Sequence, residues 1–269
     1  MSSVNLDSVK ALARARTQYL IAFDAIMIWD SLSTLRLEHR AIWQAKWTTT
    51  KVLYLLNRYG SMFWYFATSA TILKPMSTAA CQRVFWMQLV EVVYVLLVTH
   101  CILSVRLYAI FDRNARLKIC LIAFLVFETA LSIAAMSFFE PLGLPRSIAA
   151  YIGLEGCIST RKPGSPNLVL ALNIIPSVFE TSVLVAVAWK NWDATRRIGQ
   201  KVPILKRLLR DGIVYYIVIT GTHCTTAFMY AHGDPSVKTF NMPASIVLGS
   251  LACSRLILSL HQTRPHGGK

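Results

Sequence analysis

The sequence predicts an all-α membrane protein with seven transmembrane helices, and three observations support that fold class. Hydrophobic residues make up 55% of the 269 residues and charged residues only 15%, whereas soluble domains usually carry about 25% charged residues. So few polar side chains do not cover the surface of a soluble globule. In addition, seven segments are long and apolar enough to cross a bilayer, and Lys and Arg are unevenly divided between the connections.

The seven segments follow from the thickness of the bilayer, since a hydrocarbon core of about 30 Å requires roughly 20 mostly apolar residues per helix. They are about 17–35, 51–72, 84–110, 118–138, 168–190, 211–232 and 240–261. The first is the most polar, because Asp24 and Asp30 interrupt it, and the third is long enough to form one helix that extends past the membrane. Membrane β-strands alternate polar and apolar residues, but these runs are apolar on all sides. We expect one transmembrane domain over 1–269.

Lys and Arg lie mostly on one side of the predicted bundle. Including residues at span edges, 16 of the 28 fall in the first, third and fifth connections and the C-terminal tail, against 9 in the N-terminal tail and the remaining connections. Connections rich in Lys and Arg stay in the cytoplasm, so we expect the N-terminus outside and the C-terminus inside. The fifth connection, 191–210, contributes most to this asymmetry, whereas Lys10, Arg14 and Arg16 favour the opposite orientation.

A basic composition, with a pI near 9.8, is typical of proteins that bind nucleic acid. The positions of the charges argue against nucleic-acid binding here. They lie beside predicted membrane ends, where each Lys or Arg near an anionic leaflet contributes about 1 kcal/mol. We therefore expect the lipid bilayer as partner, with anionic lipids at the cytoplasmic connections, and no nucleic acid. Segment 191–210 is also open to a cytoplasmic partner. The predicted location is the plasma membrane or an endomembrane.

Four stretches of the sequence resemble a known family. They are the region from Asp24 to KVLYLLNRY (51–59), RLYAIFDRNAR (106–116), LLRDGIVYY (208–216) and SRLILSL (254–260). They resemble a family of fungal, mainly basidiomycete, membrane proteins defined by an N-terminal domain of unknown function, number 6533, which corresponds here to residues 17–62. The resemblance covers nearly the whole chain and implies a seven-helix membrane protein without implying an activity. Gly60 departs from the family pattern, which leads us to expect a longer apolar residue there.

Ionisable side chains at membrane depth cost about 2.5–3.5 kcal/mol on insertion scales, so each calls for a partner or a function. Asp30 and Arg58 fall at similar depth on consecutive spans, and we expect them to pair. Asp211 is expected to meet Arg255 or Arg106 in the same way. Arginines near helix ends also reach the interface with their guanidinium groups. We therefore interpret these candidate ion pairs as structural clamps.

Three deeper acids, Glu91, Glu128 and Glu180, have no basic residue at matched depth, and His100 and His223 are the other titratable groups near the core. One interpretation is a protonated carboxyl that hydrogen-bonds to a neighbouring helix. The other is a cation or proton relay, or a counter-ion for a ligand. Both interpretations stay open.

Polar residues recur at helical spacing on two spans, which predicts a polar cavity between them. Glu91 and Tyr94 share one stripe of the third span, and Tyr216, Thr220 and His223 share one stripe of the sixth. We expect this cavity to open to the outside. The candidate ligand-binding residues are Glu91, Tyr94, Glu180, Tyr216, Thr220 and His223.

Signatures of catalysis and of metal or cofactor binding are missing from the sequence, including H-E-x-x-H, G-x-S-x-G, the P-loop, G-x-G-x-x-G and C-x-x-C. We therefore expect no enzyme, no metal site and no cofactor. The leading hypothesis is a receptor or sensor that binds a ligand in the outward-facing cavity. The alternatives are a small-solute or proton-coupled transporter or channel, against which stands the lack of inverted repeats, and a structural or scaffold protein of the membrane.

Two of the six cysteines are predicted to form a disulfide. Cys81 precedes the third span and Cys157 lies in the fourth connection, so both face the outside in the predicted orientation. That side is oxidising, which favours a bond between them. The other four, Cys101, Cys120, Cys224 and Cys253, lie within predicted helices or at their inner ends.

Overall fold

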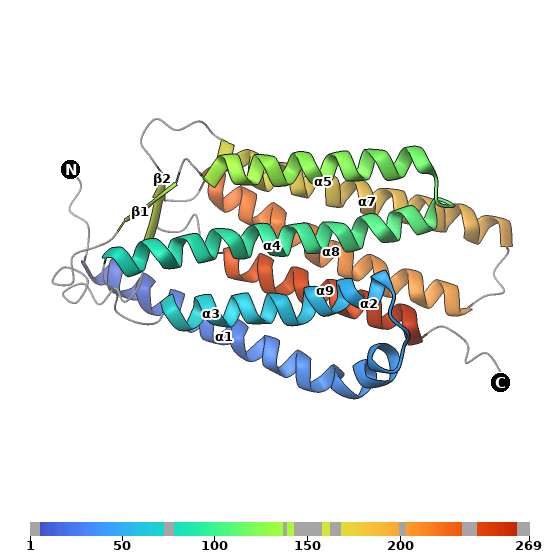
Figure 1. The fold of residues 1–269 in the computed structure, drawn as a ribbon, viewed down its shortest axis with the longest axis horizontal. Helices are drawn as coiled ribbons and strands as arrows, with labels where there is room; N and C mark the ends of the chain where they lie inside the picture. The colour runs from blue at the N-terminus through green and yellow to red at the C-terminus, as the bar shows by residue number, and fades with distance from the viewer. Residues whose placement is uncertain are drawn as a thin grey trace.

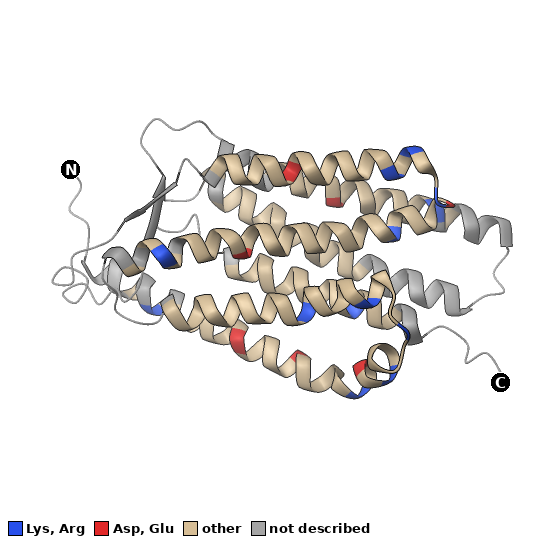
Figure 2. Ribbon diagram, in the orientation of Figure 1, with Lys and Arg blue, Asp and Glu red and all other residues tan. Residues whose placement is uncertain are grey.

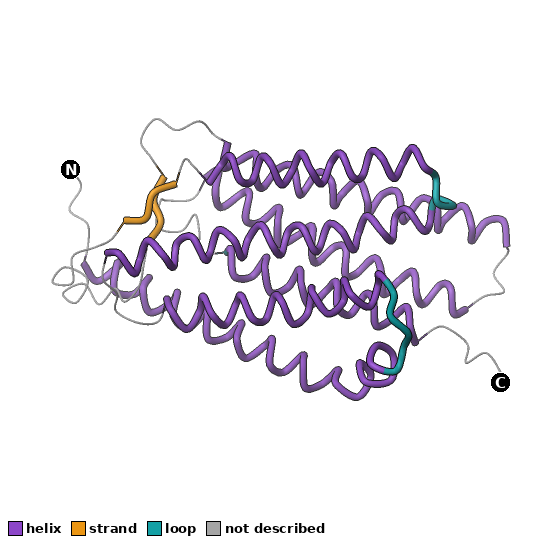
Figure 3. Tube along the Cα trace, in the orientation of Figure 1, coloured by secondary structure: helices purple, strands orange, loops and turns teal. Residues whose placement is uncertain are grey.

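The structure, a computed structural model, describes residues 6–72, 78–136, 139–142, 158–161, 168–198, 203–232 and 241–262. Within these ranges the chain forms an all-α bundle of seven long helical segments whose axes run side by side (Figures 1 and 3). The predicted all-α class with seven helices is therefore confirmed. The helices are α1 (Leu6–Glu38), α2 (Thr49–Leu55), α3 (Ser61–Ile72), α4 (Thr78–Ile110), α5 (Ala115–Met136), α7 (Leu168–Ile198), α8 (Pro203–His232) and α9 (Met242–Gln262).

Two π-helical turns interrupt the first part of the chain. The turn η1 (His39–Trp43) continues α1, and η2 (Leu56–Gly60) joins α2 to α3, so α2, η2 and α3 form one long segment. At the end of α1 the chain curls back on itself before it enters α2 (Figure 1). We call this curl, residues 35–48, the hook.

Hydrogen bonds from Lys51 hold the hook in place. The Lys51 ammonium donates to the carbonyl oxygens of Trp43, at 3.2 Å, and Ala45, at 2.8 Å, which satisfies backbone acceptors left free where the helix ends. The Thr48 hydroxyl caps α2 by accepting from the Lys51 amide at 3.2 Å. One lysine and one threonine therefore end the first helix and start the next.

Several helices extend beyond the predicted spans. Helix α1 begins at Leu6 rather than near residue 17, and α7 continues to Ile198, so the predicted connection 191–210 is mostly helical. The third span is one continuous helix, α4, as predicted. The fourth connection, predicted as a loop, contains an antiparallel pair of strands, β1 (Phe139–Leu142) and β2 (Ile158–Arg161). The sequences of these two strands are too short and irregular to show the alternation of polar and apolar residues that predicts a strand.

Two helices are long and apolar enough, by length and composition, to cross a membrane: Gln82–Ile110 and Ala115–Ala135. Pro243–Ser259 forms a shorter apolar helix. Both statements apply to the part of the chain that the structure describes.

Helices α4 and α9 form the middle of the bundle. Helix α4 contacts α3, α5, α7 and α9, and α9 also contacts α8, α1 and η2. The larger core cluster contains Leu103 and Leu107 of α4 with Cys253 and Leu256 of α9. A second cluster joins the middle of α1 to α3 and to the first turns of α4 and α9.

The distribution of polarity is the reverse of that in a soluble bundle. Large apolar side chains point outward along most helices, including Trp29 on α1, Val126 on α5, Val178 on α7 and Phe228 on α8. Several charged and polar side chains lie inside instead. Among the side chains that the structure describes, the buried acidic, basic and histidine residues are Asp30, Glu38, Lys51, Arg58, Glu91, His100, Glu128 and Glu180.

Candidate functional site

Four ionisable side chains from four helices meet in the middle of the bundle. His100 of α4 lies with its Nδ1 2.6 Å from Glu128 Oε2 of α5 and its Nε2 3.2 Å from Glu180 Oε1 of α7. His223 of α8 lies with its Nδ1 2.8 Å from Glu180 Oε1 and 2.9 Å from Oε2. We call the chain Glu128–His100–Glu180–His223 the central network.

The geometry at His100 fixes a minimum number of protons. A carboxylate only accepts hydrogen bonds, and a neutral imidazole donates from one nitrogen alone. Because both ring nitrogens of His100 face carboxyl oxygens, either His100 carries two protons or one of the two carboxyl groups carries one. The Glu128–His100–Glu180 segment therefore holds one proton more than a neutral imidazole with two carboxylates would.

The surroundings of His100 are apolar and aromatic. The rings of Phe124 and Phe179 stack with centroids 4.3 Å apart, and the His100 ring lies 5.0 Å from Phe179. His100 and Glu180 are fully buried. In such low-dielectric surroundings ionic hydrogen bonds are strong and unpaired charges are costly, so the central network joins α4, α5, α7 and α8 tightly.

Next to the central network, several buried polar atoms have no hydrogen-bond partner among the described residues. They include Thr99 Oγ1 on α4 and Tyr216 Oη and Thr220 Oγ1 on α8. The Arg106 guanidinium lies 5.4 Å from the centre of the Tyr216 ring. Leaving a buried polar group unpaired costs about 1–3 kcal/mol, so these hydroxyl groups of α4 and α8 are suited to bind water or a small polar molecule.

Of the predicted ligand-binding residues, Glu180 and His223 therefore lie in the central network, and Tyr216 and Thr220 lie on the same helix as His223. Glu91 and Tyr94 point elsewhere. Glu91 Oε2 accepts from the Thr68 hydroxyl of α3 at 2.5 Å, and the Tyr94 hydroxyl donates to the Leu56 carbonyl of η2 at 2.8 Å. The stripe of α4 that carries them faces α3 and η2, away from α8.

A second charged cluster joins α1 to η2 and α9. Arg58 contacts Asp30 Oδ2 with its NH1 at 3.3 Å and Glu38 Oε2 with its Nε at 3.1 Å. Arg255 Nε lies 2.6 Å from Asp30 Oδ1. Two arginines thus balance two carboxylates. We call Asp30, Glu38, Arg58 and Arg255 the clamp.

The clamp also organises the neighbouring aromatic residues. Glu38 Oε1 accepts from the Tyr59 hydroxyl at 2.5 Å and from the Trp43 indole N–H at 3.1 Å. Next to Arg58, the Asn57 amide donates to the Ser250 carbonyl and the Ser254 hydroxyl of α9, at 2.8 and 2.9 Å. The end of α1, η2 and α9 are thereby bound into one unit.

The structure brings Asp30 and Arg58 together, and Arg255 also contacts Asp30 of α1. The expected contact of Asp211 with Arg255 or Arg106 stays a prediction. The side chain of Asp211 lies outside those that the structure describes. So do the side chain of Cys81 and the whole of Cys157, and their disulfide stays a prediction. The four other cysteines are free thiols.

The sequence analysis missed two members of these clusters. Glu38 was placed in a connection, but η1 extends the helix and buries it against Arg58. His100 was noted only as a nearby titratable group, although it links two predicted acids. Its spacing from Glu91, nine residues or two and a half turns, places the two on opposite faces of α4, a signal that the sequence did contain.

One known family matches the part of the chain that contains most of the clamp. Residues 19–63 match a family described as "Family of unknown function (DUF6533)". No curated protein matches the chain. The matched segment runs from α1 to the beginning of α3, and it contains Asp30, Glu38 and Arg58. Residues 19–63 are therefore similar to DUF6533, a family of unknown function.

Proposed function

We propose that this chain is an integral membrane protein of the fungal seven-helix type that it resembles, that all seven helices span the bilayer, and that it acts as a receptor or sensor. The reversed polarity of the bundle supports the membrane location. Aliphatic and aromatic side chains cover much of the described surface along the helices, whereas most charged side chains of the clamp and the central network are buried and paired. Lipid chains solvate such a surface, whereas water would not.

The distribution of charge supports an orientation with the N-terminus outside. Lys and Arg gather at the end of the bundle that contains the hook and the α4–α5 turn, and Asp and Glu are spread along its length (Figure 2). Cytoplasmic ends are the ones rich in Lys and Arg. In this orientation the basic segment 191–210 also faces the cytoplasm, where we propose that it meets anionic lipid or a partner protein.

The central network carries the proposal of a receptor. It connects four helices, α4, α5, α7 and α8, through one buried chain of ionic hydrogen bonds, so a ligand that contacts it alters the contacts between those helices. The unpaired atoms of Tyr216 and Thr220 add acceptors and donors on the same side. The carboxyl groups of this network, with the hydroxyl groups of Tyr216 and Thr220 on the helix that carries His223, suit a small cationic ligand such as a protonated amine. The proposal includes no enzymatic step and no cofactor.

One observation favours a second candidate, a proton-coupled transporter. The central network holds at least one proton beyond that of a neutral imidazole, and it places four titratable groups within hydrogen-bond distance of one another. Chains of this kind conduct protons in pumps and transporters. Transport differs from sensing because it requires net movement across the membrane.

A ligand screen with matched variants tests the proposal. The purified full chain is heated in detergent with sets of small amines, carboxylates and polyols, and stabilising compounds are identified from the shift in unfolding temperature. A ligand at 100 times its Kd stabilises by about 2.7 kcal/mol. We expect amines to stabilise the protein, and Glu180→Gln and Tyr216→Phe to remove the effect.

Glu91→Gln is the matched control, since it makes the same chemical change at a buried acid that contacts α3. It should leave the amine effect unchanged. Proton flux into vesicles that contain the protein, abolished by Glu180→Gln, would establish the transporter instead. Stabilisation by amines that persists in Glu180→Gln, or no stabilisation and no flux, would contradict the proposal and favour a structural protein.

A further inference from the structure

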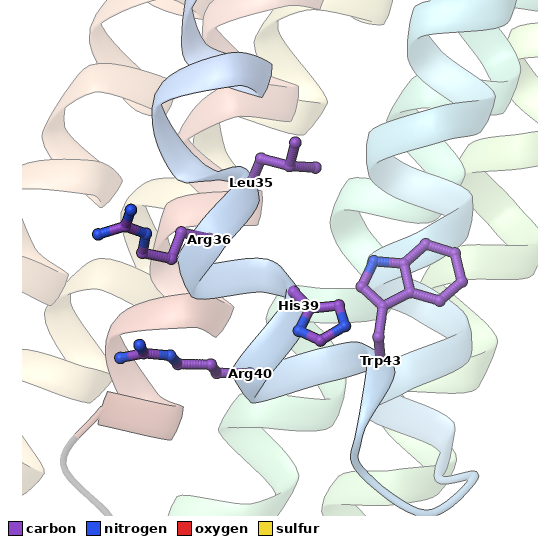
Figure 4. A pocket seen from close by; sticks show the side chains of 5 residues that line it. All are labelled: Leu35, Arg36, His39, Arg40 and Trp43. Carbon is purple, nitrogen blue, oxygen red and sulfur yellow. The ribbon is translucent and has the colours of Figure 1, made fainter.

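The hook contains a pocket with a volume of about 570 Å³. It is lined by Leu35 and Arg36 from the end of α1 and by His39, Arg40 and Trp43 from η1. Arg36 and Arg40 point the same way from successive turns, and the His39 ring lies between Arg40 and Trp43 (Figure 4). All five side chains are exposed to solvent, so the pocket is open to a partner from outside the bundle.

The lining of this pocket is basic and contains no acidic residue. Arg36 and Arg40 form no ion pair with any residue that the structure describes, in contrast to Arg58 and Arg255, which pair with the carboxylates of Asp30 and Glu38. The guanidinium group presents a planar fork of N–H donors that matches the oxygens of a phosphate. Two guanidinium groups without an ion-pair partner among the described residues, one helical turn apart, therefore suit a single phosphate group.

The wall of the pocket formed by Trp43 is held rigidly. The indole N–H donates to Glu38 at 3.1 Å, its ring packs edge-on against Tyr59 with centroids 6.2 Å apart, and Glu38 itself is fixed by Arg58. Because these contacts are all made within the protein, they hold this wall of the pocket in place independently of a partner. Preorganisation of this kind lowers the entropic cost of a complex.

An apolar track leads from the pocket along α1. Ile28, Leu32 and Leu35 follow each other at i, i+4 and i+7, and they are 50%, 66% and 52% exposed. A soluble phosphate compound makes no use of such a track. A lipid does, because its acyl chain covers the apolar side chains while its headgroup reaches the two arginines.

We infer that the pocket binds the phosphate headgroup of an anionic phospholipid of the cytoplasmic leaflet, with an acyl chain along Ile28, Leu32 and Leu35. The inference rests on the proposed membrane location and orientation, which place the hook at the cytoplasmic surface. Trp43 lies at the level of the headgroups, where tryptophan is enriched. The site is separate from the central network, so it holds the protein to a lipid rather than to the proposed ligand.

Lipid retention by the purified full chain tests the inference. The protein is released from bilayers of phosphatidylserine and phosphatidylcholine with identical acyl chains, and bound lipids are counted by native mass spectrometry. We expect phosphatidylserine to be retained selectively, and Arg36→Gln with Arg40→Gln to weaken its binding about 30-fold, the effect of removing two basic residues near anionic lipid. Arg116→Gln with Lys118→Gln is the matched control, since it removes two exposed charges at the same end of the bundle and should leave the binding unchanged.

Three results would overturn the inference. One is equal retention of the two lipids. Another is an equal loss of binding in the control pair, which would mean that only the general positive charge matters. The third is complete displacement of the lipid by inorganic phosphate, which would identify a site for soluble phosphate. Helix content measured by circular dichroism verifies that each variant is folded.

The proposed orientation and the proposed lipid site can be contradicted by different results. Selective retention that depends on Arg36 and Arg40, together with labelling that places the hook outside the cell, would support the headgroup site and contradict the proposed orientation. Correct orientation without selective retention would overturn the site alone.

Discussion

Arg58 and Arg255 contact the same carboxylate in different surroundings. The Arg58 side chain is 3% exposed and contacts both Asp30 and Glu38, whereas that of Arg255 is 45% exposed and contacts Asp30 alone. Removing Arg58 leaves two buried carboxylates with one partner fewer, whereas removing Arg255 leaves Asp30 still paired with Arg58. The two arginines therefore differ in how much they stabilise the fold.

Replacement of each arginine by methionine measures this difference. We expect Arg58→Met to lower the free energy of unfolding by about 3–5 kcal/mol, and Arg255→Met to lower it by about 1 kcal/mol or less. Denaturant titrations in detergent, followed by circular dichroism, give both values. Equal losses would mean that Glu38 and burial add nothing to the contribution of Arg58.

Gly60 shows how one missing side chain shapes the contact between η2 and α4. A Cβ atom built on Gly60 would lie 1.9 Å from the Tyr94 hydroxyl oxygen, which is an impossible approach. Glycine at this position therefore makes room for Tyr94 and for its hydrogen bond to the Leu56 carbonyl. The same contact explains why the chain lacks a longer residue after Tyr59.

Gly60→Ala should therefore destabilise the protein by about 1–3 kcal/mol, the usual cost of overpacking. Gly221→Ala is the control, because nothing lies within 4 Å of its added Cβ, and it should be neutral or stabilising by up to about 1 kcal/mol. Unfolding temperatures of the two purified variants decide the question. A shorter residue at 94, as in Tyr94→Leu, should restore part of the loss in the double variant, and no restoration would contradict the role given to Tyr94.

At the scale of helices, Glu180 holds three elements together. Its carboxylate lies against His100 of α4 and His223 of α8 while it belongs to α7. Glu91, also buried, hydrogen-bonds among the described residues to the hydroxyl of Thr68 alone. A carboxylate shared by two histidines contributes more than one that accepts a single neutral hydrogen bond.

We expect Glu180→Gln to lower the unfolding free energy by about 3–5 kcal/mol and Glu91→Gln by about 1 kcal/mol. Limited proteolysis should also show α7 and α8 separating more readily in the Glu180 variant. A larger effect at Glu91 would contradict the arrangement of the central network.

The helices were predictable because hydropathy depends only on local composition, and α4 and α5 are the clearest examples. The turns η1 and η2 were not predictable, since they depend on contacts between distant residues such as Gly60 and Tyr94. For the acids, the sequence indicated their depth but not the direction in which each points. Their spacing places Glu91 and His100 on opposite faces of α4, but only the packing of the bundle determines which neighbouring helix each face meets.

At the scale of the whole molecule, the buried clusters and the apolar surface are parts of one pattern. The clamp and the central network keep charge inside, and residues such as Trp29, Val126 and Phe228 cover the outside. The Lys and Arg that remain exposed gather toward one end (Figure 2). This pattern fits a bundle solvated by lipid along its length, with its basic end in the cytoplasm.

Labelling of tags at the two ends of the chain tests this account most directly. With the N-terminus outside and the C-terminus inside, an impermeant reagent applied to intact cells should label a tag at residue 1 and leave a tag at residue 269 unlabelled. Permeabilised cells, in which both tags react, are the control. Labelling of the C-terminal tag alone would reverse the orientation, and equal labelling of both tags on intact cells would contradict seven membrane crossings.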